Sequence, residues 1–125
     1  MSETFRTAVE TAIFARRAEK LLTASEKIDL ITQLATNPEA GDLIPETGGV
    51  RKLRFGIRGK GKAGGVRVIY YYLDDEVPLF AMLIYGKGEK ADLTADERKT
   101  VAQIAAAIKQ TAKRRKDPPR LERET

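Results

Sequence analysis

The residues best suited to chemistry lie in one segment, 51–67, which contains seven Lys and Arg side chains and no carboxylate. Lys and Arg bind phosphate and stabilise negative charge that develops on it. Five glycines are interspersed among these cations, and the uncharged run "VIYYYL" follows at 68–73. This composition suggests a phosphate-binding surface, either for a nucleotide or for a nucleic-acid backbone. A solvated loop that only keeps the protein soluble is the alternative explanation.

The residue types that the chain lacks narrow the possible chemistry. Its 125 residues include no His and no Cys. Histidine is the usual acid or base at neutral pH, and imidazole and thiolate are common metal ligands. Catalysis would therefore rely on Lys, Arg, Tyr or carboxylates, and we expect neither a metal nor another cofactor.

Two glycine motifs in the basic segment resemble nucleotide-binding loops but lack the required context. Residues 56–63, "GIRGKGKA", match the P-loop pattern, except that Ala63 replaces the Ser or Thr that binds Mg²⁺. Residues 59–64, "GKGKAG", match the dinucleotide-binding pattern. Both motifs require a helix directly after the glycines, whereas the residues that follow favour a strand. Nucleic-acid binding is therefore the better interpretation.

The residues around the basic segment have the pattern of an antiparallel sheet. Residues 50–55, 66–73 and 79–85 are rich in β-branched and aromatic side chains. The intervening residues 74–78 are few enough for a hairpin loop. The expected core residues on these strands are Leu53, Phe55, Val68, Ile69, Leu83 and Ile84.

Alternation along the first strand separates its cations from its apolar side chains. Leu53 and Phe55 point to one face, and Lys52 and Arg54 point to the other. Arg67, at the start of the next strand, lies close to the same region. We therefore expect one face of the sheet to pack against helices and the opposite face to be cationic.

Three helices are expected around this sheet. Residues 11–22 and the residues after the capping box "TASE" at 23–26 form a helical hairpin. A long helix follows a second capping box, "TADE" at 94–97, and ends before "DPP" at 117–119. Residues 4–10 could add a short strand. The buried stripes of the helices are expected to contain Phe14, Ala18, Leu21, Leu22, Ile28, Ile31, Leu34, Ala35, Val101, Ile104, Ala105, Ile108 and Ala112.

This order of elements indicates an α+β fold with a small antiparallel sheet of three to four strands. Residues 1–116 are expected to form a single domain, and residues 117–125 a flexible tail. The chain has neither the layout of a signal peptide nor an apolar run of membrane-spanning length. We therefore expect a cytoplasmic protein.

Three quoted segments carry a family resemblance: "GDLIPETGGVRKLRF" at 41–55, "GKAGGVRVIYYY" at 61–72 and "LIYGKGEKADLT" at 83–94. With the capped final helix, they resemble the RelE/HigB-type toxins of bacterial toxin–antitoxin systems, from about Phe5 to about Lys109. The resemblance implies a small sheet flanked by helices. In many members it also implies ribosome-dependent cleavage of mRNA, in which the 2′-hydroxyl attacks the adjacent phosphorus without a metal.

The resemblance also implies site residues. The basic strand pair of the family falls on Lys52 and Arg54, its strand arginine on Arg67, and its basic segment after the last strand on Lys87 and Lys90. Arg67, Arg54, Lys52 and Lys87 are accordingly the candidate catalytic residues. The candidate RNA-binding residues are Arg51, Arg58, Lys60, Lys62, Lys90 and Tyr70.

The chain departs from the family pattern where an acid and a base would be expected. Gly88 stands where some members have an arginine, and the tyrosine that several members carry shortly afterwards is absent. Glu89 and Asp92 are the nearby carboxylates. A gyrase poison of the ParE type and a non-catalytic binding module therefore remain alternatives. The implied partners are a cognate antitoxin with a helix-turn-helix DNA-binding domain, the ribosome and mRNA, with no membrane.

Overall fold

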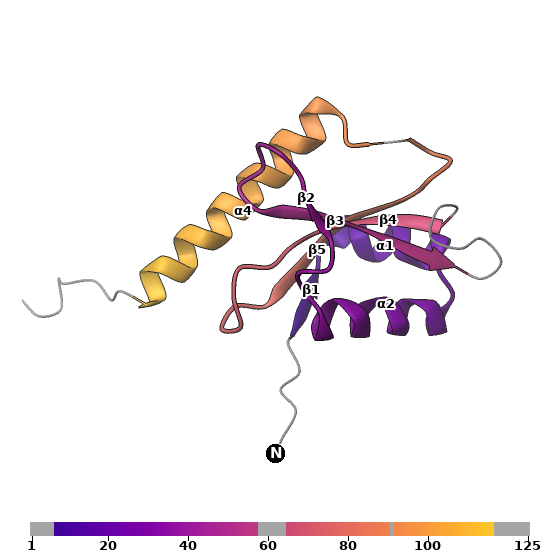
Figure 1. Ribbon diagram of the computed structural model, residues 1–125, viewed down its shortest axis with the longest axis horizontal. Coiled ribbons are helices and arrows are strands. Elements are labelled where there is room, and N and C mark those ends of the chain that lie inside the picture. Colours follow the sequence, from indigo (N-terminus) through magenta and orange to yellow (C-terminus); the bar gives the residue numbers. More distant parts are fainter. Residues whose placement is uncertain (1–6, 58–64, 91, 117–125) are drawn as a thin grey trace, which may run out of the picture.

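The computed structural model describes residues 7–57, 65–90 and 92–116, which form three helices and a five-stranded sheet. Figure 1 shows α1 and α2 on one side of the sheet and α4 crossing the other side. The elements in chain order are β1 (Ala8–Glu10), α1 (Ala12–Leu21), α2 (Ala24–Thr36), β2 (Asp42–Leu43), β3 (Val50–Ile57), β4 (Gly65–Tyr71), β5 (Leu79–Gly86) and α4 (Ala95–Lys116).

The sheet has the strand order β1-β5-β4-β3-β2. Strands β3, β4 and β5 form the expected antiparallel meander, and β2 pairs antiparallel with β3. The α+β class, the helical hairpin and the C-terminal helix are confirmed. The sheet is larger than expected, because it includes the two-residue strand β2. It is also mixed, because β1 pairs parallel with β5.

Side-chain caps begin each of the three helices where the sequence indicated a start. The Thr11 hydroxyl accepts a hydrogen bond from the Phe14 amide at 3.1 Å. Thr23 and Glu26 form the predicted capping box of α2. Thr94 and Glu97 exchange the same two bonds at α4, at 2.9 and 3.1 Å. Each such cap contributes about 1 kcal/mol, so the helix starts are encoded locally.

The helical hairpin packs on one face of the sheet. Phe14 and Ala18 of α1, together with Leu30 and Leu34 of α2, are completely buried in this cluster. The expectation for Ile28 is wrong, since its side chain is 65% exposed. Ile28 precedes the buried Leu30 by two residues, or about 200° of helical turn, so it lies on the opposite side of α2.

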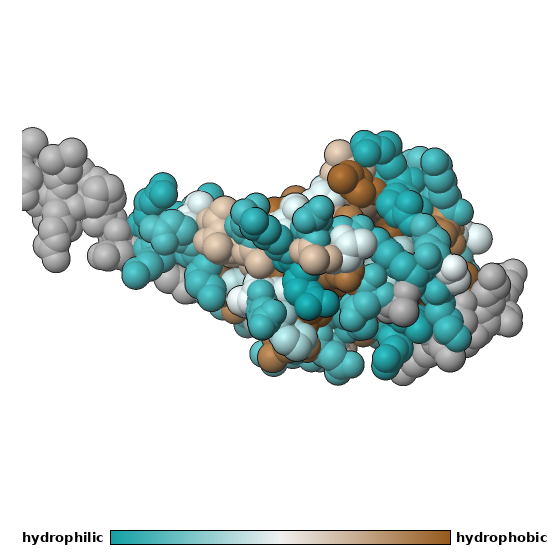
Figure 2. All heavy atoms as spheres, turned by 90° about the horizontal axis from the view of Figure 1, so that it is seen from above, coloured by the Kyte–Doolittle hydropathy of each residue, from teal (hydrophilic) through white to brown (hydrophobic). Residues whose placement is uncertain are grey.

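The second face of the sheet is also partly buried, under α4. Val50, Ile69 and Tyr71 pack there with Val101 and Ala105 of the helix. All seven residues of β4 are buried, because both faces of this strand are covered. Val68 packs in the core under the helical hairpin, whereas Ile69 packs under α4. Leu83 likewise packs on the α4 side and is partly buried. In Figure 2, the view onto this side is mainly hydrophilic, with a few apolar patches. Because helices cover both faces of the sheet, only part of the α4 side is available to bind a ligand.

None of the helices within the described ranges is long and apolar enough to cross a membrane.

Candidate functional site

The cations of β3 and β4 gather on the α4 side of the sheet, at the end that points away from the Val50–Tyr71 pair. Arg54 lies directly opposite Arg67 in the register of the two strands. Lys52 is two residues along β3 and faces the same side. Arg54 is exposed, whereas Arg67 is only 8% exposed. An anion bound at this position would be attracted by both guanidinium groups. The expectation of a cationic face is therefore correct only for this part of the sheet, because α4 packs on the rest of the same face.

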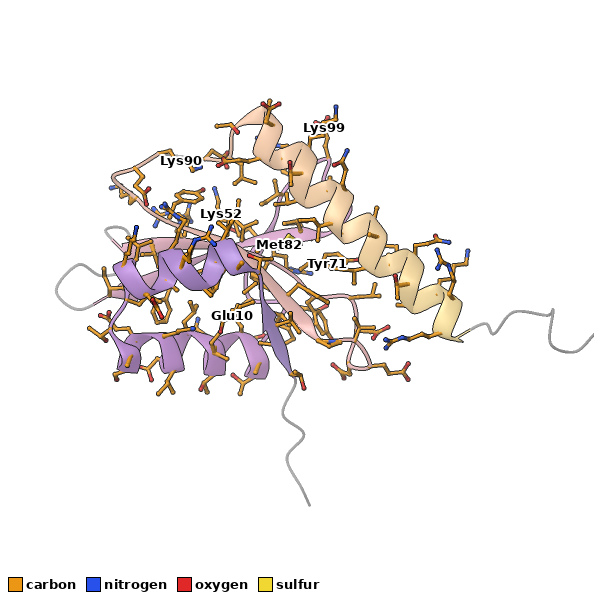
Figure 3. All side chains as sticks on the ribbon, turned by 180° about the vertical axis from the view of Figure 1, so that it is seen from behind. Glu10, Lys52, Tyr71, Met82, Lys90 and Lys99 are labelled. Carbon is orange, nitrogen blue, oxygen red and sulfur yellow. The ribbon has the colours of Figure 1, made fainter. Side chains whose placement is uncertain are left out.

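The segment that leads into α4 places carboxylates against this face. Lys52 Nζ lies 3.7 Å from Asp92 Oδ1, and Lys90 Nζ lies 2.5 Å from Glu97 Oε2. Figure 3 shows Lys52 and Lys90 on the side of the sheet where α4 begins. Burial opposes ionisation of Glu97, but hydrogen bonds from Lys90 and Thr94 outweigh it and hold its pKa below the ordinary value. Two of the candidate lysines are therefore paired with acids: Lys52 with Asp92 of the segment before α4, and Lys90 with Glu97 of the first turn of α4.

Tyr85 of β5 lies at the centre of this group and was not singled out from the sequence. It is the register partner of Arg67, and Lys90 Nζ lies 5.0 Å from the centre of its ring. The side chain is 2% exposed, and its hydroxyl has no hydrogen-bond partner within the described part of the chain. Burial raises the pKa of Tyr85 and so does Asp92, while Arg67 acts in the opposite direction. The hydroxyl therefore keeps its proton at neutral pH.

The turn after β5 is held from the first helix by Arg17, a second residue that the sequence did not single out. Arg17 Nε donates to the Ile84 carbonyl at 2.7 Å, and its Nη2 contacts both carboxylate oxygens of Glu89 at 2.5 Å. Glu89 Oε1 also accepts from the Gly86 amide at 2.7 Å. That backbone bond and the contact with Arg17 lower the pKa of Glu89. Arg17 thus fixes the turn that carries Lys87 and Lys90.

Lys87 is exposed on this turn, and its amide donates to the Gly65 carbonyl at 3.1 Å. Gly88 is exposed next to it, and a Cβ atom built there would meet no atom within 4 Å. The backbone of the turn is therefore tied to the start of β4, two residues from Arg67.

A cavity of about 490 Å³ adjoins these residues, between α1, β5 and α4. Its polar wall includes Arg17, Tyr85, Glu89, Lys90 and Glu97. Its apolar wall comes from β5, from α4 and from Ile13 of α1. The site thus combines an exposed cationic surface with a recess beside Tyr85.

Two candidate RNA-binding residues do not join the site. The expectation for Tyr70 is wrong: the ring is completely buried, and its hydroxyl donates to the Pro38 carbonyl at 2.7 Å and accepts from the Gly41 amide at 2.9 Å. Arg51 points to the opposite face from Lys52, where it donates to the carbonyls of Glu39 and Gly41. Both residues position the loop after α2.

The remaining candidates, Arg58, Lys60 and Lys62, lie outside the described residues. They belong to the connection between β3 and β4, whose flanking strand ends carry the Arg54–Arg67 pair.

Comparisons with known proteins agree with this architecture. The family described as "RelE toxin of RelE / RelB toxin-antitoxin system" matches residues 6–117. Among solved structures, the free Escherichia coli toxin RelE, in a form with two arginines replaced by alanine, is similar with a TM-score of 0.51. The alignment has 19% identity and covers 79% of this chain and 95% of that chain. The fold is shared, and the family match spans nearly the whole sequence. The chain belongs to the RelE family of toxins of toxin–antitoxin systems.

Proposed function

We propose that this toxin is a ribosome-dependent mRNA endoribonuclease that acts in the cytoplasm. The observation that carries the proposal is the Arg54–Arg67 pair, with Lys52 beside it, on one face of the sheet. Strands hold these cations more rigidly than a loop would, and charge stabilisation in catalysis depends on such preorganisation. Arg54 is exposed, so a substrate as large as a nucleic acid can reach it.

In the proposed reaction, the 2′-oxygen attacks the adjacent phosphorus as its proton leaves. The bond between phosphorus and the 5′-oxygen breaks, and that oxygen takes up a proton. The products are a 2′,3′-cyclic phosphate and a 5′-hydroxyl. Arg67 and Arg54 stabilise the negative charge on the phosphorane, and Lys87 binds a neighbouring phosphate. Lys52 and Asp92, 3.7 Å apart, are the groups placed to exchange the protons.

The family also implies a cognate antitoxin. We propose that it neutralises the toxin by covering the cationic face. In the simplest arrangement, acidic side chains of the antitoxin replace the RNA phosphates. The part of the antitoxin that binds DNA would be a helix-turn-helix domain.

The first experiment measures cleavage of mRNA on purified ribosomes by the intact protein and by Arg67→Ala. Removing a preorganised charge from a transition state costs about 10²- to 10³-fold in rate, so we expect a loss of that size. Arg54→Ala should also lose activity, and because Arg54 is exposed its removal leaves the fold intact. Lys99→Ala, a charge-matched change at an exposed position of α4, should cleave normally.

Other outcomes decide between the alternatives. Cleavage unaffected by both arginine changes would disprove the site assignment. Growth arrest on induced expression with DNA damage and intact mRNA would identify a gyrase poison. Harmless expression together with binding to an antitoxin would identify a binding module.

A further inference from the structure

Tyr85 combines a buried ring with a polar group that the fold does not use. Its side chain is 2% exposed, and its hydroxyl oxygen is buried without a hydrogen-bond partner in the described part of the chain. Leaving a buried polar group without a partner costs about 1–3 kcal/mol. Phenylalanine would fill the same space without that cost. The fold alone therefore gives no reason for a hydroxyl at this position.

The surroundings of Tyr85 indicate what could use the hydroxyl. Arg67 is its register partner on β4, and Lys90 Nζ lies over its ring. Both are cations, so an anion that binds between them comes close to the Tyr85 side chain. The ring also borders the cavity beside β5. A neutral phenol is a hydrogen-bond donor, and a phosphate oxygen is the acceptor that these cations attract.

The carboxylates near Tyr85 belong to the segment before α4 and to its first turn. Asp92 pairs with Lys52, and Glu97 pairs with Lys90. Side-chain ion pairs with this much exposure are worth about 1 kcal/mol or less. An RNA phosphate can therefore compete with Glu97 for Lys90, and both members of that ion pair line the cavity beside Tyr85.

We propose that the Tyr85 hydroxyl donates a hydrogen bond to a non-bridging oxygen of the scissile phosphate, next to Arg67. The tyrosine keeps its proton throughout, and the bonds made and broken are those of the cleavage reaction itself. The hydroxyl thereby gains the hydrogen-bond partner that the described residues do not supply. This inference rests on the proposed endoribonuclease activity.

The test compares the intact protein with Tyr85→Phe in cleavage of ribosome-bound mRNA. A hydrogen bond to a charged group contributes enough to change a rate by about 10- to 100-fold. We expect a loss of that size in the rate at saturating ribosome concentration, with little change in the ribosome concentration for half-maximal rate. The melting temperature should be unchanged or higher, because the variant removes an unpaired buried hydroxyl.

Tyr71→Phe is the matched control. Tyr71 is another buried tyrosine in the same cluster, but its register partners are Val50 and Phe80, whereas Tyr85 lies opposite Arg67. It should cleave at the normal rate. Equal cleavage by the intact protein and Tyr85→Phe would overturn the inference and leave the endoribonuclease function standing. A lowered melting temperature with normal cleavage per folded molecule would overturn it in favour of a structural role. Absence of cleavage by the intact protein would overturn both proposals.

Discussion

Tyr70 and Tyr85 lie on opposite faces of the same sheet and show how differently the two faces are built. Both rings are buried. The hydroxyl of Tyr70 makes two hydrogen bonds, to Pro38 and Gly41, on the side of the helical hairpin. The hydroxyl of Tyr85, on the α4 side, makes none with any described residue. The first completes the fold, and the second retains an unused hydrogen-bond donor.

Neighbouring cations of β3 show the same division. Arg51 faces the helical hairpin and is bound by the carbonyls of Glu39 and Gly41. Lys52 and Arg54 face the α4 side, where Arg54 is exposed opposite Arg67. Strand alternation therefore gives residues of one chemical type two kinds of role. The hairpin face supplies stability, and the cationic end of the α4 face supplies the groups that bind an anion.

The change expected to separate the faces most clearly is Tyr70→Phe. It leaves the Pro38 carbonyl and the Gly41 amide without their buried partner, and each unsatisfied group costs about 1–3 kcal/mol. Urea unfolding should show a loss of at least that size in the free energy of unfolding. Cleavage per folded molecule should be unchanged, because the ring is completely buried on the hairpin face.

The two tyrosine variants together test this division of roles. Tyr85→Phe should leave the free energy of unfolding unchanged or raised, opposite in direction to Tyr70→Phe. If both variants lost stability equally and both kept full activity, the two faces would not differ in function.

Much of the fold follows from local patterns in the sequence. Capping boxes at Thr23 and Thr94 fixed two helix starts, because their hydrogen bonds involve residues three apart. Alternation placed Lys52 and Arg54 on the face opposite Leu53, since side chains in a strand change sides at every residue. These are local rules, and they hold wherever the element itself forms.

The features that the sequence did not reveal depend on packing between distant segments. Arg17 and Glu89 meet across 72 positions, and Tyr70 meets Gly41 across 29. The helical or strand periodicity of a sequence does not predict contacts between such distant residues. The sequence does not distinguish Tyr70 from a tyrosine that stacks on a base. It also does not show that Tyr85 is buried, because that burial depends on the packing of α4. The parallel pairing of β1 with β5 was not predicted either, because it joins segments about 70 residues apart in the sequence.

A smaller effect is expected from Gly88→Arg, which adds a cation to the functional region without touching the hairpin face. A side chain at Gly88 meets no atom within 4 Å, so the fold should tolerate it. One additional phosphate contact should strengthen ribosome binding by about two- to ten-fold and steepen its dependence on salt. Binding measured at two salt concentrations checks this, with Gly88→Ala as the control for the backbone. Equal binding by the two variants would place Gly88 outside the RNA surface.

The smallest effect concerns the pH dependence of stability, through Glu97. Its pKa in the folded protein is lowered from 4.5, because hydrogen bonds from Lys90 and Thr94 outweigh the effect of burial. A group with a lowered folded pKa stabilises the protein above the unfolded pKa, and that contribution is lost as the pH falls through the folded value. Glu97→Gln keeps the capping geometry, since Gln also serves in a capping box, and removes only the charge paired with Lys90.

We therefore expect Glu97→Gln to unfold at a slightly lower urea concentration than the intact protein at about pH 7, and the difference to disappear in acid. Because the Lys90–Glu97 pair is partly exposed, the difference at neutral pH should be about 1 kcal/mol or less. The same variant frees Lys90, so its affinity for ribosomes should rise while its stability falls. A difference in stability that persists in acid would show that the amide disturbs the cap rather than the ion pair. Unchanged affinity for ribosomes would show that Lys90 does not contact RNA, and the cationic site would then be confined to the strands.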